Sequence, residues 1–352
     1  MPDSDAAPFP VFDRDVAAAR LAWLAERGVY IGTSSWKYPG WLGRLYEPGR
    51  YLTRGKVSQA KFERECLREH AEVFHTVCVD AGYYRFPSPE WIAGLMEQTP
   101  PGYNFTFKVT DDITARTFPN LPRHGEKAGQ RNEHFLDAPL FQQTLIQTLT
   151  PWKDRLGVLI FEFSQFHARD FERGRDFVEA LDQFFSLLPK GWNYGVEIRN
   201  KGFLHAEYFD MLRSHGVAHV FNQWTRMPDV GDQMNLPGST DTADFLAARF
   251  LLRQGRTYEQ AVEKFSPYEA IKEPFPEARD AAERLVQLVL KSPSPNAEGK
   301  KKKAFIYINN RLEGNSLETI FAILMRHSLY PEGLPLLLPT PPPKAPPPGN
   351  LL

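Results

Sequence analysis

Cysteine is almost absent from this chain, and so is any long run of apolar residues. The 352 residues include only two cysteines, Cys66 and Cys78, which are too few for a disulfide framework and do not have the spacing of a zinc site. No apolar stretch reaches the roughly 18 residues that a membrane-spanning helix needs. The amino terminus is acidic and interrupted by proline, unlike a secretory signal. These absences predict a cytoplasmic protein that is not attached to a membrane.

The chain also lacks an excess of charge of either sign. Its 42 Lys and Arg residues nearly balance 43 Asp and Glu residues, which gives a net charge of −1. A protein that coats nucleic acid is usually strongly basic, so the composition argues against nucleic acid as a partner while leaving room for a local basic cleft. No glycine-rich fingerprint follows the first predicted strand, which argues against a dinucleotide-binding fold.

What the chain does have is an alternation of strand-like and helix-like segments. The predicted strands are 29–34, 76–80, 104–110, 157–163, 194–200, 217–221, 243–251 and 304–310. Helical patterns separate nearly all of them, and this alternation implies parallel pairing with right-handed crossovers. Eight such units predict an α/β fold, a closed (β/α)₈ barrel of the TIM type. An open, doubly wound sheet is the alternative, and the seventh strand also fits a helix because of its two alanines.

The chain divides into three parts. Residues 1–28 form an N-terminal extension with a short helix, the barrel spans 29–330, and residues 331–352 are so rich in proline that we expect an extended, disordered tail. Two long connections, 223–242 and 253–277, flank the seventh strand. Connections of this length predict lids or decorations, so the barrel should carry insertions around that strand.

The strand at 194–200 carries two charged residues, Glu197 and Arg199, that leave its same face. Burying such charges is costly unless they pair or face a polar cavity. A structural ion pair is one interpretation, and a ligand site is the other, because barrel enzymes place their sites where the strands end. Other predicted strands also end in polar residues: Thr33, Ser34, Asp80, Lys108, Thr110, Glu162, Asn222, Arg249, Asn309 and Asn310.

Three of these side chains, Lys108, Arg199 and Arg249, are cationic groups of the kind that hold a phosphate or carboxylate. Glu197 is the candidate catalytic base beside them, with Glu162 as the alternative. We therefore expect a cavity suited to a small anionic ligand. A self-satisfied network of ion pairs is the competing interpretation.

Other residues are candidates for contacting the ligand. The side-chain amides of Asn309 and Asn310 could orient the ligand by hydrogen bonds. The aromatic loop after the first strand adds Trp36 and Tyr38. No group of histidines has the pattern of a metal centre, so no metal site is assigned, although a carboxylate-only magnesium site stays open.

Several stretches resemble the signatures of the YecE-like family, a domain of unknown function. Residues 31–41 resemble its opening signature, 83–89 its second and 105–108 its third, while 196–199 and 309–310 resemble two later ones. The second stretch adds Tyr84 and Arg85 to the candidate binding residues. The resemblance implies a (β/α)₈ barrel, similar in outline to those of metal-dependent abasic-site endonucleases and sugar isomerases.

This sequence is a divergent member on that comparison, because it lacks three histidines of the family pattern. Ala115, Asn200 and Leu251 stand where the family has His, and Asn222 stands where it has Asp. Losing imidazoles removes the side chains best suited to proton transfer near neutral pH. The cationic and amide groups remain.

Three functions are therefore open. The first is a hydrolase or lyase that acts on a phosphorylated or otherwise anionic small molecule. The second is a ligand-binding protein that has lost its chemistry with the family histidines. The third, nucleic-acid processing, rests on analogy of fold and is weakened by the near-neutral charge. No cofactor and no oligomeric state follow from these patterns.

Overall fold

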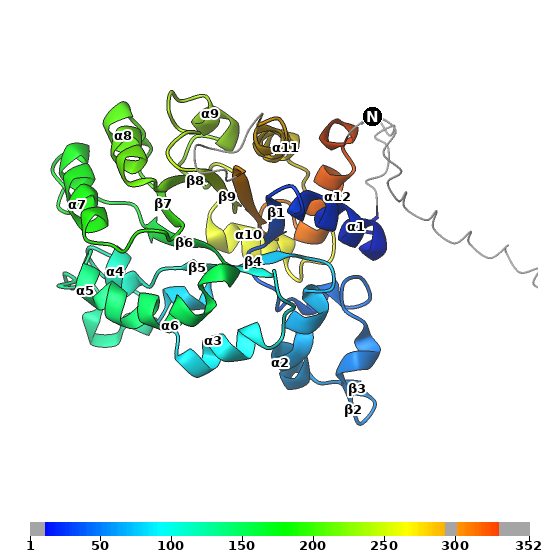
Figure 1. Ribbon diagram of the computed structural model, residues 1–352. Coiled ribbons are helices and arrows are strands. Elements are labelled where there is room, and N and C mark those ends of the chain that lie inside the picture. The colour runs from blue at the N-terminus through cyan, green and yellow to red at the C-terminus, as the bar shows by residue number, and fades with distance from the viewer. Residues whose placement is uncertain (1–10, 293–300, 331–352) are drawn as a thin grey trace, which may run out of the picture.

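Eight parallel strands close into a barrel, as the sequence predicts (Figure 1). The computed structural model describes residues 11–292 and 301–330, so the predicted proline-rich tail and the start of the extension lie outside the described residues. Neighbours follow the order β1-β10-β9-β8-β7-β6-β5-β4, and β4 returns to β1. The barrel strands are β1 (Val29–Thr33), β4 (Thr76–Val79), β5 (Asn104–Lys108), β6 (Leu156–Phe163), β7 (Tyr194–Ile198), β8 (Ala218–Gln223), β9 (Phe245–Phe250) and β10 (Lys303–Ile308).

Helices surround the barrel (Figure 1). They are α1 (Arg14–Ala25), α2 (Gln59–His70), α3 (Pro89–Met96), α4 (Asp111–Thr114), α5 (Ala138–Phe141), α6 (Gln147–Leu149), α7 (Gly174–Ser186), α8 (Ala206–His215), α9 (Val230–Met234), α10 (Tyr258–Phe265), α11 (Pro276–Leu290) and α12 (Ser316–Leu324). A small antiparallel hairpin, β2 (Leu52–Thr53) and β3 (Lys56–Val57), lies outside the barrel. In the described ranges no helix is long and apolar enough to span a bilayer.

The ambiguous segment 243–251 is a strand, β9, which is paired on both sides. The pattern over 133–149 predicts one helix, but the structure is helical only from Ala138 to Leu149, so the predicted start is wrong. There the helix begins at Ala138, because Asp137 accepts a hydrogen bond from the backbone N–H of Leu140 at 2.9 Å and Pro139 occupies the first turn. A π-helical segment, Gln142–Ile146, then separates α5 from α6.

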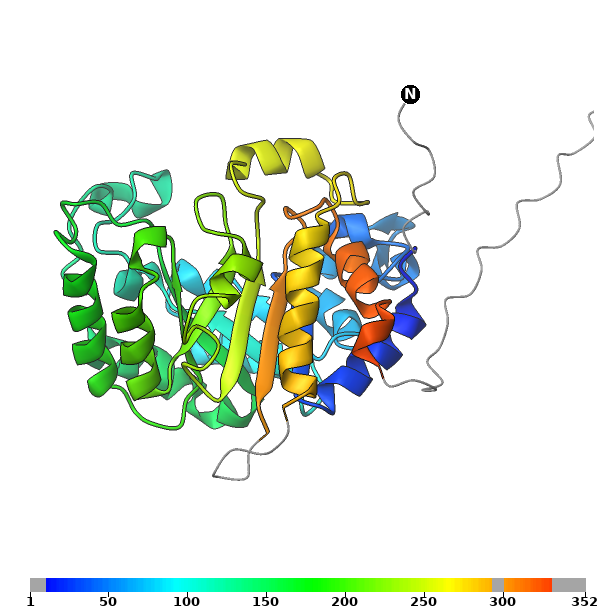
Figure 2. The same cartoon turned by 90° about the horizontal axis from the view of Figure 1, so that it is seen from above.

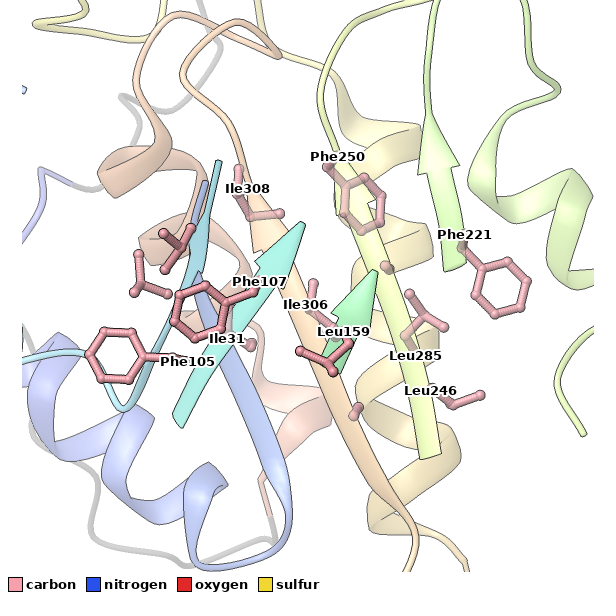
Figure 3. Packing of buried hydrophobic residues seen from close by; sticks show 14 of the residues in the cluster. Ile31, Phe105, Phe107, Leu159, Phe221, Leu246, Phe250, Leu285, Ile306 and Ile308 are labelled. Atoms are coloured by element: carbon pink, nitrogen blue, oxygen red, sulfur yellow. The ribbon is translucent and has the colours of Figure 1, made fainter. Parts of the chain in front are cut away.

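Strand side chains divide into two apolar layers. The outward-facing set packs against the helices. Figure 3 shows part of this cluster, with Phe105 and Phe107 on β5 and with Leu285 on α11. The inward-facing set fills the barrel with a smaller cluster, which includes Cys78, Val158, Ile160, Val220, Ala247, Phe305 and Tyr307. Glycine makes room there: a Cβ on Gly157 would lie 3.0 Å from the ring of Phe305.

The connection after β9 lies across the end of the barrel at which the strands finish. In Figure 2, α10 (yellow) lies beyond the ends of β9 and β10. Phe265 and Ala261 of this helix pack with Leu252 into a small core of their own. Tyr268, just after the helix, packs edge-on against Tyr38 of the loop after β1, with ring centroids 5.8 Å apart. The insertion predicted at 253–277 is therefore an ordered cover over part of the strand ends.

The described part of the N-terminal extension is packed against the barrel's last helix. Leu21 and Leu24 of α1 are buried. Arg20, also buried, donates a hydrogen bond to the carbonyl of Leu324 at 2.6 Å. These contacts join α1 to the end of α12.

Candidate functional site

Where β4, β5, β6, β7 and β9 end, the inward-facing positions are charged instead of apolar. Each lies two residues beyond another inward-facing residue, so strand alternation places it inside the barrel. This charged layer contains three carboxylates and three cations: Asp80, Lys108, Glu162, Glu197, Arg199 and Arg249. Because the two signs are equal in number, the layer carries no net charge.

Arg249 on β9 connects carboxylates from three other strands. Its Nη1 lies 2.7 Å from Oε2 of Glu197 and also contacts Glu162, while its Nη2 lies 3.0 Å from Oδ1 of Asp80. Only 2 % of the Arg249 side chain is exposed. One buried guanidinium therefore bridges β4, β6 and β7 across the barrel.

Arg199, just beyond β7, makes a second set of contacts. Its Nη2 lies 2.6 Å from Oε1 of Glu197 and 3.2 Å from Oε2 of Glu162. Its Nη1 donates a hydrogen bond to Oδ1 of Asn222 at 3.4 Å. The ring of Trp224 covers the guanidinium, with its centroid 4.0 Å from Cζ. Arg199 is thus fixed on several sides before any ligand arrives.

Glu162 is the carboxylate that all three cations share. Lys108 places its Nζ 3.0 Å from Oε2 of Glu162 and 3.9 Å from the centroid of the Tyr83 ring. Burial by itself would raise the pKa of Glu162, but Lys108, Arg199 and Arg249 together hold that pKa well below its ordinary value. Glu162 is therefore ionised at neutral pH.

Glu197 is poorly placed to act as a general base. Its side chain is fully buried, and each of its two oxygens faces a guanidinium, from Arg199 on one side and Arg249 on the other. A general base must reach the proton that it removes, directly or through one water. The charged layer fits a structural network better than proton transfer at this carboxylate.

A cleft opens beside the charged layer, at the ends of β6, β7 and β8. We call it the β7 cleft, and its volume is about 360 Å³. Its lining is Gln165, Arg199, Asn200, Lys201, Gly202, Phe203 and Arg226. Three of these residues are cationic and none is a carboxylate. Arg199 belongs to both the charged layer and the cleft, so it links the balanced interior to a positively charged surface.

Hydrogen bonds between loops hold the walls of the β7 cleft. Asn200 accepts a hydrogen bond from the backbone N–H of Phe166 at 2.8 Å and donates one to the carbonyl of Phe166 at 3.0 Å. Arg226 donates from Nη1 to Oε1 of Gln165 at 2.7 Å. The loops after β6, β7 and β8 therefore form one connected rim.

The candidate residues at the ends of β1 and β10 do not share one environment. Thr33 faces outward, where its hydroxyl lies 3.0 Å from Nε2 of His70, so it is remote from the charged layer. Ser34, Asn309 and Asn310 are buried. The hydroxyl of Ser34 and the amide nitrogens of both asparagines have no hydrogen-bond partner among the described residues. The amide oxygens are engaged, because that of Asn309 accepts from the backbone N–H of Arg311 and that of Asn310 accepts from Ser316, so only the amide donors and the Ser34 hydroxyl are unused.

The aromatic and signature residues differ in burial. Trp36 is buried in the core. Tyr38 packs between Trp41 and the segment after α10, and its ring centroid lies 4.7 Å from that of Trp41. Tyr84 is 57 % exposed, and Arg85 is also exposed. The rings that do cover the charged layer belong to other residues, at positions 83 and 224.

Sequence reasoning missed the cleft residues that lie in loops. Lys201 had no usable signal, because it begins a short 3₁₀-helix, Lys201–Phe203, to which the alternation of β7 (Tyr194–Ile198) does not extend. Arg226 had none, since it lies in a connection without periodicity. Within residues 11–292 and 301–330, no group of three or more His, Cys, Asp or Glu side chains is arranged to hold a metal ion.

Comparison with known proteins gives the family and the fold. The family described as "Protein of unknown function DUF72" matches residues 30–346. A DUF72 family protein from Thermotoga maritima MSB8 is 19 % identical with a TM-score of 0.52, over 84 % of this chain and 97 % of that one. A DUF72 family protein from Enterococcus faecalis V583 is 15 % identical with a TM-score of 0.54, over 84 % and 94 %. No curated protein matches. At these identities the likeness to the solved structures shows the fold alone.

Proposed function

Since this chain belongs to the DUF72 family of proteins of unknown function, we propose its function from its own geometry: it binds a small phosphorylated or otherwise anionic molecule in the β7 cleft. One observation carries the proposal. The lining holds three cations and no carboxylate, whereas the charged layer beside it is balanced. An anion is the ligand that such a lining attracts.

Lys201 and Arg226 are the cations available to a ligand. Both are exposed at the rim, and within the described chain neither forms an ion pair with a carboxylate. Arg199 has a different part, because Glu197 and Asn222 already fix its guanidinium. It contributes a fixed positive wall, while the two exposed cations close on the anion.

We favour binding over catalysis at this site. Among its described lining residues the β7 cleft has neither a histidine nor a carboxylate to move a proton. Glu197, the sequence-based candidate base, lies behind Arg199 and is fully buried. A ligand-binding protein without hydrolase or lyase activity is consistent with this arrangement. A cytoplasmic location also fits, since both cysteines are free thiols.

Calorimetric titration of the full chain with inorganic phosphate and pyrophosphate tests the proposal. We expect Lys201→Gln and Arg226→Gln each to weaken binding about tenfold, as loss of a hydrogen bond to a charged group does. Lys56→Gln, which changes an exposed lysine on the hairpin outside the barrel, is the matched control and should leave affinity unchanged. Absence of binding at low ionic strength, or equal weakening by the control, would refute an anion site in this cleft.

A further inference from the structure

A second cleft adjoins the β7 cleft, and Gln165 lines both. This β6 cleft has a volume of about 380 Å³ and lies between the loops at 114–120 and 164–170, with Gly129 at its edge. We propose that the two clefts form one binding site for a phosphate ester of an aromatic group. The phosphate lies in the β7 cleft and the aromatic ring in the β6 cleft. This inference rests on the proposed function, because it extends the same anion site.

Mostly buried rings give the β6 cleft its apolar part. Phe118, Pro119 and Phe166 contribute to its lining. Phe166 is anchored from behind by other aromatic rings, with Phe177 at 4.9 Å and Phe171 at 5.0 Å between centroids. An aromatic ring that is already fixed loses little conformational entropy when a planar group packs on it. Proteins that bind single-stranded nucleic acid without sequence preference stack bases on aromatic side chains in the same way.

Arg116 supplies a flat cation in the same cleft. Its Cζ lies 4.8 Å from the centroid of Phe171 and 5.2 Å from that of Phe135. Burial lowers the pKa of this guanidinium, and the charge of Arg131 lowers it further, against a smaller opposing effect of Asp170. Within the described ranges no carboxylate forms a salt bridge with Arg116. The electron-rich face of an aromatic ring, or negative charge carried with it, would stabilise this cation.

One acid, Asp170, also lines the β6 cleft, and its negative charge partly offsets the charge of Arg116. Asp170 accepts hydrogen bonds from the hydroxyl of Thr117 at 3.2 Å and from the backbone N–H of His167 at 2.8 Å, so its oxygens are engaged within the loop. Arg169 lies exposed at the rim. The cleft therefore combines aromatic walls with cationic edges.

The place where the two clefts meet corresponds to the bond that joins the phosphate to the aromatic group in such a ligand. Arg226 donates to Gln165 from the β7 side, so a cation is positioned where the phosphate ends and the ring begins. Inorganic phosphate alone would fill only a small part of the two clefts, each of which lies at the lower end of the range for ligand pockets, about 300–1,000 Å³. A phosphate joined to a planar ring uses both surfaces.

Titration with phenyl phosphate, inorganic phosphate and phenol tests the inference on the full chain. Phenyl phosphate should bind about tenfold more tightly than inorganic phosphate. In Arg116→Gln this advantage should disappear while the affinity for inorganic phosphate is retained, whereas Lys201→Gln should weaken both ligands. Arg169→Gln, at an exposed position, gives a second variant with little risk to folding, and it should reduce the advantage of phenyl phosphate.

Each outcome separates the two proposals. If inorganic phosphate fails to bind, the proposed function fails together with this extension. If inorganic phosphate binds and phenyl phosphate binds no more tightly, the anion site stands and the aromatic subsite is refuted. If the advantage of phenyl phosphate survives both Arg116→Gln and Arg169→Gln, the ring lies elsewhere and the inference is overturned.

Discussion

Replacing Arg249 with methionine removes the guanidinium that joins three carboxylates across the barrel. The charged layer would then hold two cations, Lys108 and Arg199, beside three carboxylates. Water cannot compensate for the missing charge, because Glu197 is fully buried and Glu162 is only 12 % exposed. Uncompensated negative charge in such surroundings is strongly destabilising.

The expected loss is large compared with the stability of a folded chain. Removing one partner of a buried ion pair costs about 3–5 kcal/mol, and whole domains have free energies of unfolding of about 5–15 kcal/mol. We expect Arg249→Met to lower the free energy of unfolding by about 4 kcal/mol. For a chain of this size, that loss corresponds to a shift of the urea midpoint by about 1–2 M.

Adding Glu197→Gln to the Arg249→Met variant provides the decisive comparison. It removes one negative charge, so the doubly substituted layer again has equal numbers of cations and carboxylates. The double variant should be more stable than Arg249→Met by about 2 kcal/mol, although it carries one more substitution. Urea unfolding followed by circular dichroism measures all members of the cycle, and it stays informative even if the single variant is unfolded.

The control is Arg85→Met, which changes an exposed arginine and should alter stability by less than about 0.5 kcal/mol. A coupling energy near zero between positions 197 and 249 would refute the view that the layer acts as one electrostatic unit. So would an Arg249→Met protein as stable as the original chain.

Two further predictions concern the core. Burial lowers the pKa of His70 to about 3 and that of His219 to about 4, so both stay neutral in the folded chain while the unfolded chain takes up protons below about pH 6.5. The free energy of unfolding should therefore be highest above about pH 6.5 and fall by about 2.5 kcal/mol per histidine by about pH 4.5. His219→Gln should make this dependence on pH less steep. An unchanged dependence would contradict a neutral His219 in the folded chain. Gly195→Ala would place a Cβ 2.7 Å from Val220 and 3.0 Å from Val158 inside the barrel, so it should cost about 1–3 kcal/mol in thermal or urea unfolding, and a neutral effect would contradict such tight packing.

The barrel could be predicted from the sequence because its signal is local. Each strand and most helices carry their own periodicity, and the alternation of the two then fixes parallel pairing. The predicted start of the helix over 133–149 is wrong because apolar spacing continues across a capping signal, Asp137 followed by Pro139. Periodicity shows which face is apolar, whereas caps determine where a helix begins.

The site was predictable in part for the same reason. Strand ends meet at one face of a barrel, so the convergence of Lys108, Arg199 and Arg249 follows from topology. The ion-pair partners of these cations do not follow from topology, since ion pairing depends on which side chains meet across the interior of the barrel. Thr33 was assigned to the site although strand alternation alone places it on the opposite face from Ser34. Lys201 and Arg226 lie in loops, where no repeating pattern reports position.

The distribution of charge in the layer bears on how the barrel assembles. The half that contains β4, β5 and β6 contributes Asp80, Lys108 and Glu162, an excess of one negative charge. The half that contains β7 and β9 contributes Glu197, Arg199 and Arg249, an excess of one positive charge. Neither half can bury its own strand ends in a neutral state. Each therefore needs the other before its interior can close, which favours a barrel that forms as one cooperative unit over two half-barrels that fold separately and then dock.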